Sequence, residues 1–162
     1  MSHAVVITRT TTTTTSTSHV VLNTGYLRTT PGLLKLAQLI IGAVNVGLVS
    51  WHFRSYYAAN PQVFFLLMAV AFLIGTFCLL ASCLVSLSTG GIISKTAYEL
   101  FYHTVAFVLY LIASIILLVH ITDYSYGSNY KNSHIAAAVL GIVVSALYLF
   151  SAVLAQRSYR GI

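Results

Sequence analysis

Four long apolar stretches, almost free of charged side chains, constrain the fold of this chain more than any other feature. They cover residues 33–53, 63–87, 97–121 and 135–155, and each can supply the roughly 20 residues that a helix needs to cross a bilayer. The apolar residues run continuously and do not alternate with polar ones, which excludes a membrane β-barrel. The sequence therefore predicts four membrane-spanning helices.

The composition is that of an integral membrane protein. Of the 162 residues, 58% are hydrophobic, and only ten are charged, eight of them Lys or Arg and two Asp or Glu. Because a soluble domain carries roughly 25% charged residues, an ordinary soluble enzyme is excluded. The net charge of +6 does not indicate a nucleic-acid partner, since the basic residues stand singly along the chain and form no patch.

The segments between the apolar stretches are too short to hold a folded domain of their own. We therefore expect residues 26–157 to form one domain, an antiparallel, M-shaped four-helix bundle. The Thr-rich residues 1–25 are expected to be a disordered tail, which serves either as a phosphorylation platform or, as we favour, as a spacer. Residues 158–162 are expected to be a second, short tail.

The basic residues predict the orientation of the bundle in the membrane. If the N-terminus is cytosolic, six of the eight basic residues lie in cytosolic segments, which satisfies the positive-inside rule. These six are Arg9, Arg28, Lys35, Lys95, Arg157 and Arg160, and the remaining two are Arg54 and Lys131. We therefore expect both termini to be cytosolic.

Two of the predicted helices carry their polar residues on one face. The face of the first comprises Lys35, Gln38, Gly42, Asn45 and His52, and that of the third comprises Glu99, His103, Ala106 and Tyr110. A polar face turned toward lipid is costly, so both faces should point into the bundle. Lys35 and Glu99 would then both lie near the cytosolic leaflet, where they can form a pair.

Ionisable residues inside a membrane span are candidates for function. Glu99 and His103 could line a proton or ion pathway, or they could make structural polar contacts. A pathway needs such groups to continue across the membrane, whereas only Tyr110 and Ser114 follow before His120. We favour the structural interpretation for Lys35, Gln38, Asn45, Glu99, His103 and Tyr110.

Small residues recur at helical spacing in the second and fourth stretches. The second has Ala71, Gly75, Cys78, Ser82 and Ser86, and the fourth has Ala137, Gly141, Ser145, Tyr148 and Ala152. Such spacing lets helices approach closely in lipid, so we expect Gly42, Gly75, Ser82, Gly141 and Ser145 to mediate helix packing. Cys83 is interpreted as a packing residue, with S-palmitoylation as the alternative.

The sequence contains no nucleophile–base pair, metal-ligand cluster or phosphate-binding loop. We therefore expect no catalytic, cofactor-binding or metal-binding residues, and no enzymatic activity.

Three segments of the chain follow a pattern seen in known membrane proteins: residues 25–39, GYLRTTPGLLKLAQL, residues 109–114, LYLIAS, and residues 136–152. They resemble the segment that opens the first helix, the third helix and the last helix of MARVEL-domain proteins, and of the plasmolipin-like and chemokine-like-factor group in particular. The resemblance covers residues 25–157. Many members of the group have an acidic residue shortly after the last-helix tyrosine, where this chain has Phe150 and Ser151.

The resemblance implies a non-enzymatic protein that organises membrane domains, membrane apposition or vesicle trafficking. Its implied partners are membrane lipids, including those of cholesterol-rich domains, and other membrane proteins in homo- or hetero-oligomers. Its implied location is the plasma membrane or endosomal and secretory vesicles. Two alternatives stay open: a small oligomeric ion or proton channel or transporter, and a structural component of cell junctions.

Overall fold

The computed structural model of the chain describes residues 24–51, 53, 60–85, 97–123 and 127–161. Within these residues the chain forms a short 3-10 helix, η1 (Thr24–Arg28), followed by four α-helices. They are α1 (Thr30–Trp51), α2 (Asn60–Val85), α4 (Ala97–Asp123) and α5 (Ser128–Arg160). All four are long and apolar enough to cross a membrane, which confirms the predicted all-α class with four spans.

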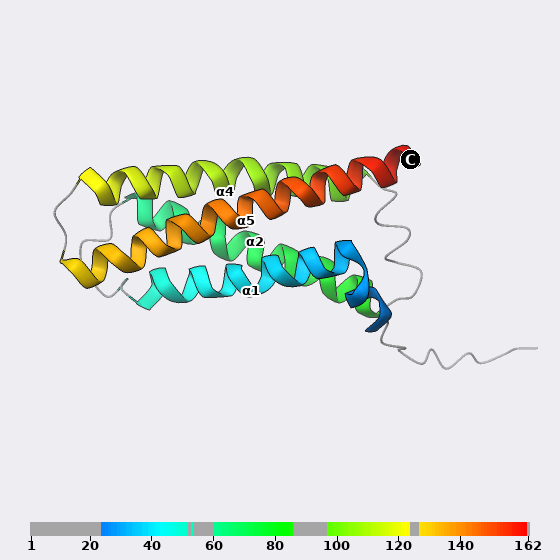
Figure 1. Cartoon of the computed structure of the whole chain (residues 1–162), viewed down its shortest axis with the longest axis horizontal. Coiled ribbons are helices and arrows are strands. Elements are labelled where there is room, and N and C mark those ends of the chain that lie inside the picture. The colour runs from blue at the N-terminus through cyan, green and yellow to red at the C-terminus, as the bar shows by residue number, and fades with distance from the viewer. Residues whose placement is uncertain (1–23, 52, 54–59, 86–96, 124–126, 162) are drawn as a thin grey trace, which may run out of the picture.

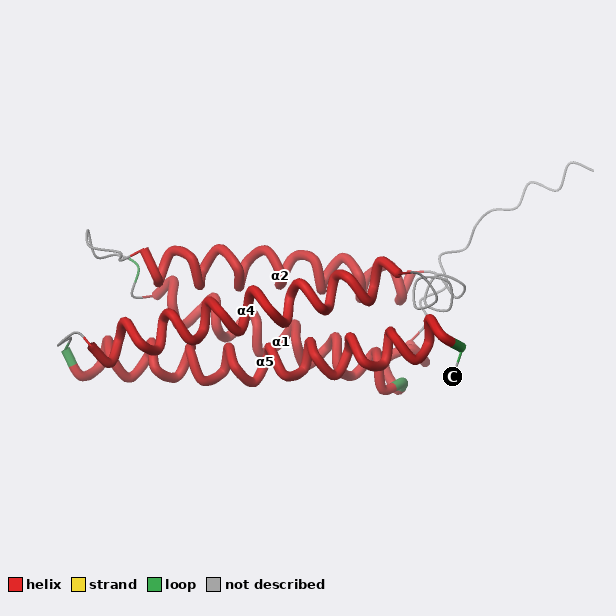
Figure 2. Tube along the Cα trace, turned by 90° about the horizontal axis from the view of Figure 1, so that it is seen from above, coloured by secondary structure: helices red, strands yellow, loops and turns green. Residues whose placement is uncertain are grey.

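The four helices lie along one long axis and successive helices run in opposite directions (Figure 1, Figure 2). The start of α1 and the end of α5 therefore lie at the same end of the bundle (Figure 1), which we call the termini end. The other end is called the opposite end. Helix α1 packs against α2 and α5, and α4 packs against the same two helices. As a result, α1 faces α4 across the centre of the bundle, and α2 faces α5.

Local sequence explains where α1 begins and where α5 stops. The hydroxyl of Thr29 accepts a hydrogen bond from the backbone N–H of Gly32 at 3.3 Å, which caps the start of α1. Pro31 follows in the first turn, where its missing N–H leaves no gap in the helix. At the far end, Gly161 adopts a left-handed φ of 72° and its N–H bonds to carbonyls of the last turn, a conformation that favours glycine.

Helix α5 extends well beyond the apolar stretch that predicted it. Helix α5 begins at Ser128, well before residue 135, and continues through Ser158–Arg160, which were expected to be a tail. The reason is that hydropathy marks only the part of a helix that lies in hydrocarbon, whereas the helix itself continues until a residue stops it. At the other terminus, Thr24 and Gly25 belong to η1; the remainder of the expected tail, residues 1–23, lies outside the described residues.

The bundle is apolar on its outside and partly polar within. Large apolar side chains such as Leu67, Phe101 and Phe150 are exposed on the outer surface, where they suit lipid. The buried polar side chains are Lys35, Gln38, Asn45, Gln62, Thr76, Glu99, His103, Ser114, His134, Ser145 and Ser151. This distribution follows from the solvent, because hydrocarbon offers no hydrogen bonds and polar groups must find partners inside the protein.

Two of the predicted packing glycines occupy places with no room for a side chain. A Cβ at Gly141 would lie 2.9 Å from Cε2 of Phe65 and against the hydroxyl of Ser114. A Cβ at Gly75 would lie 2.6 Å from the hydroxyl of Tyr102. Each glycine therefore lets a bulky ring of a neighbouring helix lie against its backbone.

The other predicted packing residues differ in their surroundings. A Cβ at Gly42 would make an ordinary contact of 3.4 Å with Leu73, and Ser145 is buried and donates to the carbonyl of Ile142 in its own helix. Ser82 does not mediate packing within the bundle: it is exposed and donates to the carbonyl of Cys78. The prediction for Ser82 was wrong because α2 is apolar on all sides, so its small residues did not reveal which face is buried.

Candidate functional site

The termini end of the bundle holds a buried ion pair between facing helices. The Nζ of Lys35, on α1, donates to the carboxylate of Glu99, on α4, and both side chains are shielded from solvent. Lys35 also donates to the hydroxyl of Tyr26 in η1 at 3.0 Å. The structure thus brings together the two residues that the sequence suggested as a pair, and it adds Tyr26 as a third member.

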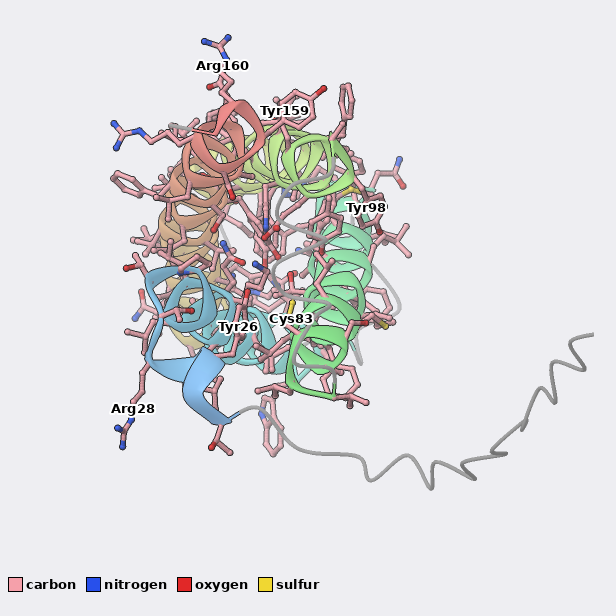
Figure 3. The ribbon with its side chains drawn as sticks, turned by 90° about the vertical axis from the view of Figure 1, so that its right-hand side faces the viewer. Tyr26, Arg28, Cys83, Tyr98, Tyr159 and Arg160 are labelled. Atoms are coloured by element: carbon pink, nitrogen blue, oxygen red, sulfur yellow. The ribbon has the colours of Figure 1, made fainter. Side chains whose placement is uncertain are left out.

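Tyr26 closes the termini end over this pair. The side chains of Tyr26 and Cys83 lie together on the inner side of the bundle, whereas Arg28 and Arg160 point away from it (Figure 3). The pKa of the Tyr26 hydroxyl is raised, first by burial and second by the neighbouring Cys83. Cys83 is itself buried, as expected of a packing residue, while Cys78 is exposed on the outer face of α2.

One helical turn deeper lies His103, which is completely buried. Its Nε2 is 3.5 Å from the carboxylate of Glu99, and its ring lies 5.2 Å from that of Tyr102 and 5.9 Å from that of Tyr148. At the same level, the side-chain amide of Gln38 donates to the hydroxyl of Ser151 at 2.8 Å. This hydrogen bond joins α5 to α1.

Two further hydrogen bonds cross the centre of the bundle. The amide of Asn45 on α1 donates to the hydroxyl of Tyr110 on α4 at 3.0 Å. The hydroxyls of Thr76 on α2 and Tyr148 on α5 are 2.7 Å apart. Together with the Lys35–Glu99 pair, these contacts join both pairs of facing helices through the middle of the bundle.

The hydroxyl cluster around Thr76 was not predicted from the sequence. Thr76 also lies 3.0 Å from the hydroxyl of Tyr102, which in turn donates to the backbone carbonyl of Phe72. The available signal was weak: Thr76 interrupts the apolar run of the second stretch, Tyr148 was considered only as part of a small-residue face, and Tyr102 was not considered.

An apolar layer separates this polar half from the opposite end. It is formed by completely or almost completely buried side chains from all four helices, namely Val49, Phe65, Ala69, Leu117, Ile121, Ala137 and Ala138. On α4 the layer lies between Ser114 and Ile121, whereas on α2 and α5 the buried polar residues Gln62 and His134 are only about one turn from Phe65 and Ala137. Beyond it, the amide of Gln62 donates to the hydroxyl of Tyr130, and the ring of His134 stacks on Tyr130.

The arrangement is suited to holding helices together. Its charged and polar groups are bonded mainly to one another across helix interfaces, and among the described residues no group of three or more His, Cys, Asp or Glu side chains could hold a metal ion. The predicted polar faces of α1 and α4 thus meet in the centre of the bundle, apart from His52, which lies outside the described residues.

Comparison with known proteins agrees with this architecture. No curated protein and no solved structure matches the chain. Residues 26–154, most of its length, match the MARVEL family, which is described as a membrane-associating domain. The match begins at Tyr26, which closes the termini end, and includes every residue of the buried polar contacts described above. The chain therefore belongs to the MARVEL family of four-span membrane proteins.

Proposed function

We propose that the chain is a non-enzymatic membrane organiser, which acts in membrane domains, membrane apposition or vesicle trafficking with both termini in the cytosol. The observation that carries this proposal is the set of three contacts across the bundle centre, Lys35–Glu99, Asn45–Tyr110 and Thr76–Tyr148. Because side chains bond facing helices to each other through the middle, the centre of the bundle is filled, and its outer surface is the part that can contact lipids and other proteins.

The outer surface offers two kinds of lipid contact that support the proposal. A groove of about 560 Å³ lies between α1 and α5 and is lined by Val44, Gly47, Leu48, Trp51 and Ser133. The indole of Trp51, at the end of α1, is 81% exposed, and tryptophan at this position favours the headgroup boundary. Acyl chains of membrane lipids are the natural occupants of such a groove.

The termini end also carries three exposed arginines. Arg28 lies in η1, and Arg157 and Arg160 lie in the last turn of α5. Anionic lipids of the cytosolic leaflet attract such residues with about 1 kcal/mol each. A cytosolic termini end would therefore hold the bundle against an anionic leaflet.

The competing function is a proton or ion channel through Glu99 and His103. The apolar layer opposes it, because beyond Ser114 an ion would have to pass buried apolar side chains from all four helices before it reached Gln62 and His134. A component of cell junctions would differ from the membrane organiser in its location, and not in how the bundle works.

Reconstitution into proteoliposomes tests the proposal. Vesicles that contain the purified chain and an internal pH dye should show no proton flux above that of empty vesicles, with or without the Glu99→Gln substitution. Flux that disappears in Glu99→Gln would contradict the organiser and establish a channel. In giant vesicles with coexisting liquid phases, the labelled chain should concentrate in one phase or at the phase boundary; a uniform distribution would contradict domain organisation.

The site of action is tested in cells. A tagged chain concentrated at cell contacts would favour the junction component, whereas vesicular membranes favour trafficking. An N-terminal tag reached by antibody from outside intact cells would contradict the cytosolic termini.

A further inference from the structure

Several buried polar atoms inside the bundle make no hydrogen bond to any described residue. They are Oε1 of Gln38, Oδ1 of Asn45 and Nδ1 of His103, whose Nε2 instead lies 3.5 Å from the carboxylate of Glu99. The three side chains are at most 1% exposed. Buried polar atoms without partners are rare in proteins and indicate that something else completes their hydrogen bonding.

Two of these three residues belong to one level of the bundle. Gln38 lies one turn after Lys35 on α1, and His103 lies one turn after Glu99 on α4. Because Lys35 and Glu99 are paired and α1 and α4 run in the same direction (Figure 1), Gln38 and His103 lie at the same level of the bundle. From α5, Ser151 bonds to Gln38, and the ring of Tyr148 lies 5.9 Å from that of His103. Three helices thus contribute polar groups to this level.

The chemistry of these groups defines what can bind there. Oε1 of Gln38 only accepts hydrogen bonds, and Nδ1 of a neutral imidazole accepts one when Nε2 carries its proton toward the Glu99 carboxylate. The ligand must therefore donate hydrogen bonds. It must also be uncharged, because the Nζ of Lys35 repels a cation and the carboxylate of Glu99 repels an anion. It must be small, since Gln38 and His103 are themselves at most 1% exposed.

We propose that Gln38, His103 and Ser151 form a binding site for internal water within the membrane-spanning part of the bundle. The water donates to Oε1 of Gln38 and bonds to a ring nitrogen of His103, so it has the two or more polar partners that a buried water requires. It also gives the imidazole of His103 a group with which to exchange protons, while the apolar layer prevents exchange with the opposite end.

Asn45 provides a matched comparison. It lies two turns from Gln38 on the same face of α1, about 10 Å along the helix, and its own unpartnered oxygen sits beside the hydroxyl of Tyr110. A change at Asn45 removes a similar buried amide without touching the site around His103.

Transfer of magnetisation from water to side chains, measured by solid-state NMR on the isotope-labelled chain in lipid bilayers, tests the proposal. The ring of His103 should receive water magnetisation several-fold faster than the methyl groups of Leu117, which is equally buried but lies in the apolar layer. In Gln38→Leu the transfer to His103 should fall to the level of Leu117, whereas Asn45→Leu should leave it unchanged.

Two results would overturn the proposal. One is a His103 ring in the unaltered chain that receives no more water magnetisation than Leu117, a comparison that needs no variant to fold. The other is a Gln38→Leu variant in which the transfer to His103 is undiminished. The readout is independent of any membrane-organising activity, so this proposal and the proposed function can each fail alone.

Discussion

Removing one member of the Lys35–Glu99 pair should destabilise the bundle far more than removing both. The side chains are 1% and 7% exposed, and loss of one partner of a buried pair leaves an uncompensated charge, which typically costs about 3–5 kcal/mol. Replacing both by neutral side chains of similar size removes the charge altogether. We therefore expect Lys35→Met and Glu99→Gln to be damaging singly, and the double variant to recover most of the loss.

The neighbours of the pair predict which single change is worse. In Lys35→Met, the carboxylate of Glu99 keeps His103 at 3.5 Å, and a protonated imidazole can compensate its charge. In Glu99→Gln, the ammonium of Lys35 keeps only the neutral hydroxyl of Tyr26 at 3.0 Å. Glu99→Gln should therefore lie at the upper end of the range, about 5 kcal/mol, and Lys35→Met at the lower end, about 3 kcal/mol.

Cys83 supplies the assay. The chain has two cysteines, and in a Cys78→Ala background only the buried Cys83 remains to react with a fluorogenic maleimide as the bundle opens on heating in detergent. At about 2–4 °C per kcal/mol for a chain of this size, the single variants should lower the midpoint by about 6–20 °C. Thr104→Val is a suitable control, because Thr104 is on the same helix, exposed, and bonded only to its own backbone at Leu100.

The reasoning is refuted if the double variant melts as low as the sum of the two single losses. Single variants that melt together with the Thr104→Val control would refute it as well. Either result would mean that the two charges do not depend on each other for their burial.

Three further predictions test other parts of the structure. Gly141→Ala should overpack the bundle and lower the thermal midpoint by an amount equivalent to about 1–3 kcal/mol. Gly47→Ala, where an added Cβ meets nothing within 4 Å, should instead raise stability by up to about 1 kcal/mol. Equal effects of the two substitutions would contradict the close packing at Gly141. Phe65→Ala, in the apolar layer and fully buried, should cost about 3–5 kcal/mol in the same melting assay, and a loss below 1 kcal/mol would contradict the tight layer. The pKa of Tyr26 is raised in the folded chain, so the unfolded chain releases this proton at a lower pH, and the stabilisation from a neutral Tyr26 is present below pH 10 and declines as the pH rises above about 10. The thermal midpoint of the unaltered chain should therefore fall more steeply above about pH 10 than that of Tyr26→Phe. Midpoints that fall equally with pH in the two chains would show that Tyr26 is not buried.

The ion pair was accessible to sequence reasoning because charge is scarce. In a membrane span, a lone lysine and a lone glutamate have few ways to avoid lipid, and the directions of the helices place Lys35 and Glu99 at the same depth. The third member, Tyr26, could not be inferred in this way. It lies outside the spans, and its position depends on the bend between η1 and α1, where the backbone carbonyl of Tyr26 lies directly against Gly32.

The contacts of α2 were hidden by its uniform hydropathy. Where every side of a helix is apolar, the sequence does not indicate which side is buried, so Ser82 was assigned to the inside and Thr76 was overlooked. Tyr148 was difficult to interpret for a similar reason, since a tyrosine can be a packing ring or a hydrogen-bond partner. It takes both roles at once: its ring lies 5.9 Å from that of His103, and its hydroxyl lies 2.7 Å from that of Thr76.

The unequal lengths of the helices have a consequence for where the bundle can reside. Helix α1 has 22 residues and α5 has 33, which correspond to about 33 Å and 50 Å, against a hydrocarbon thickness of about 30 Å. In a thicker bilayer α5 still reaches water at both ends, whereas the ends of α1 would be drawn into hydrocarbon. The tolerance of the whole bundle to membrane thickness is thus set by its first helix, and hydrophobic mismatch at α1 would bias the protein toward thinner membranes.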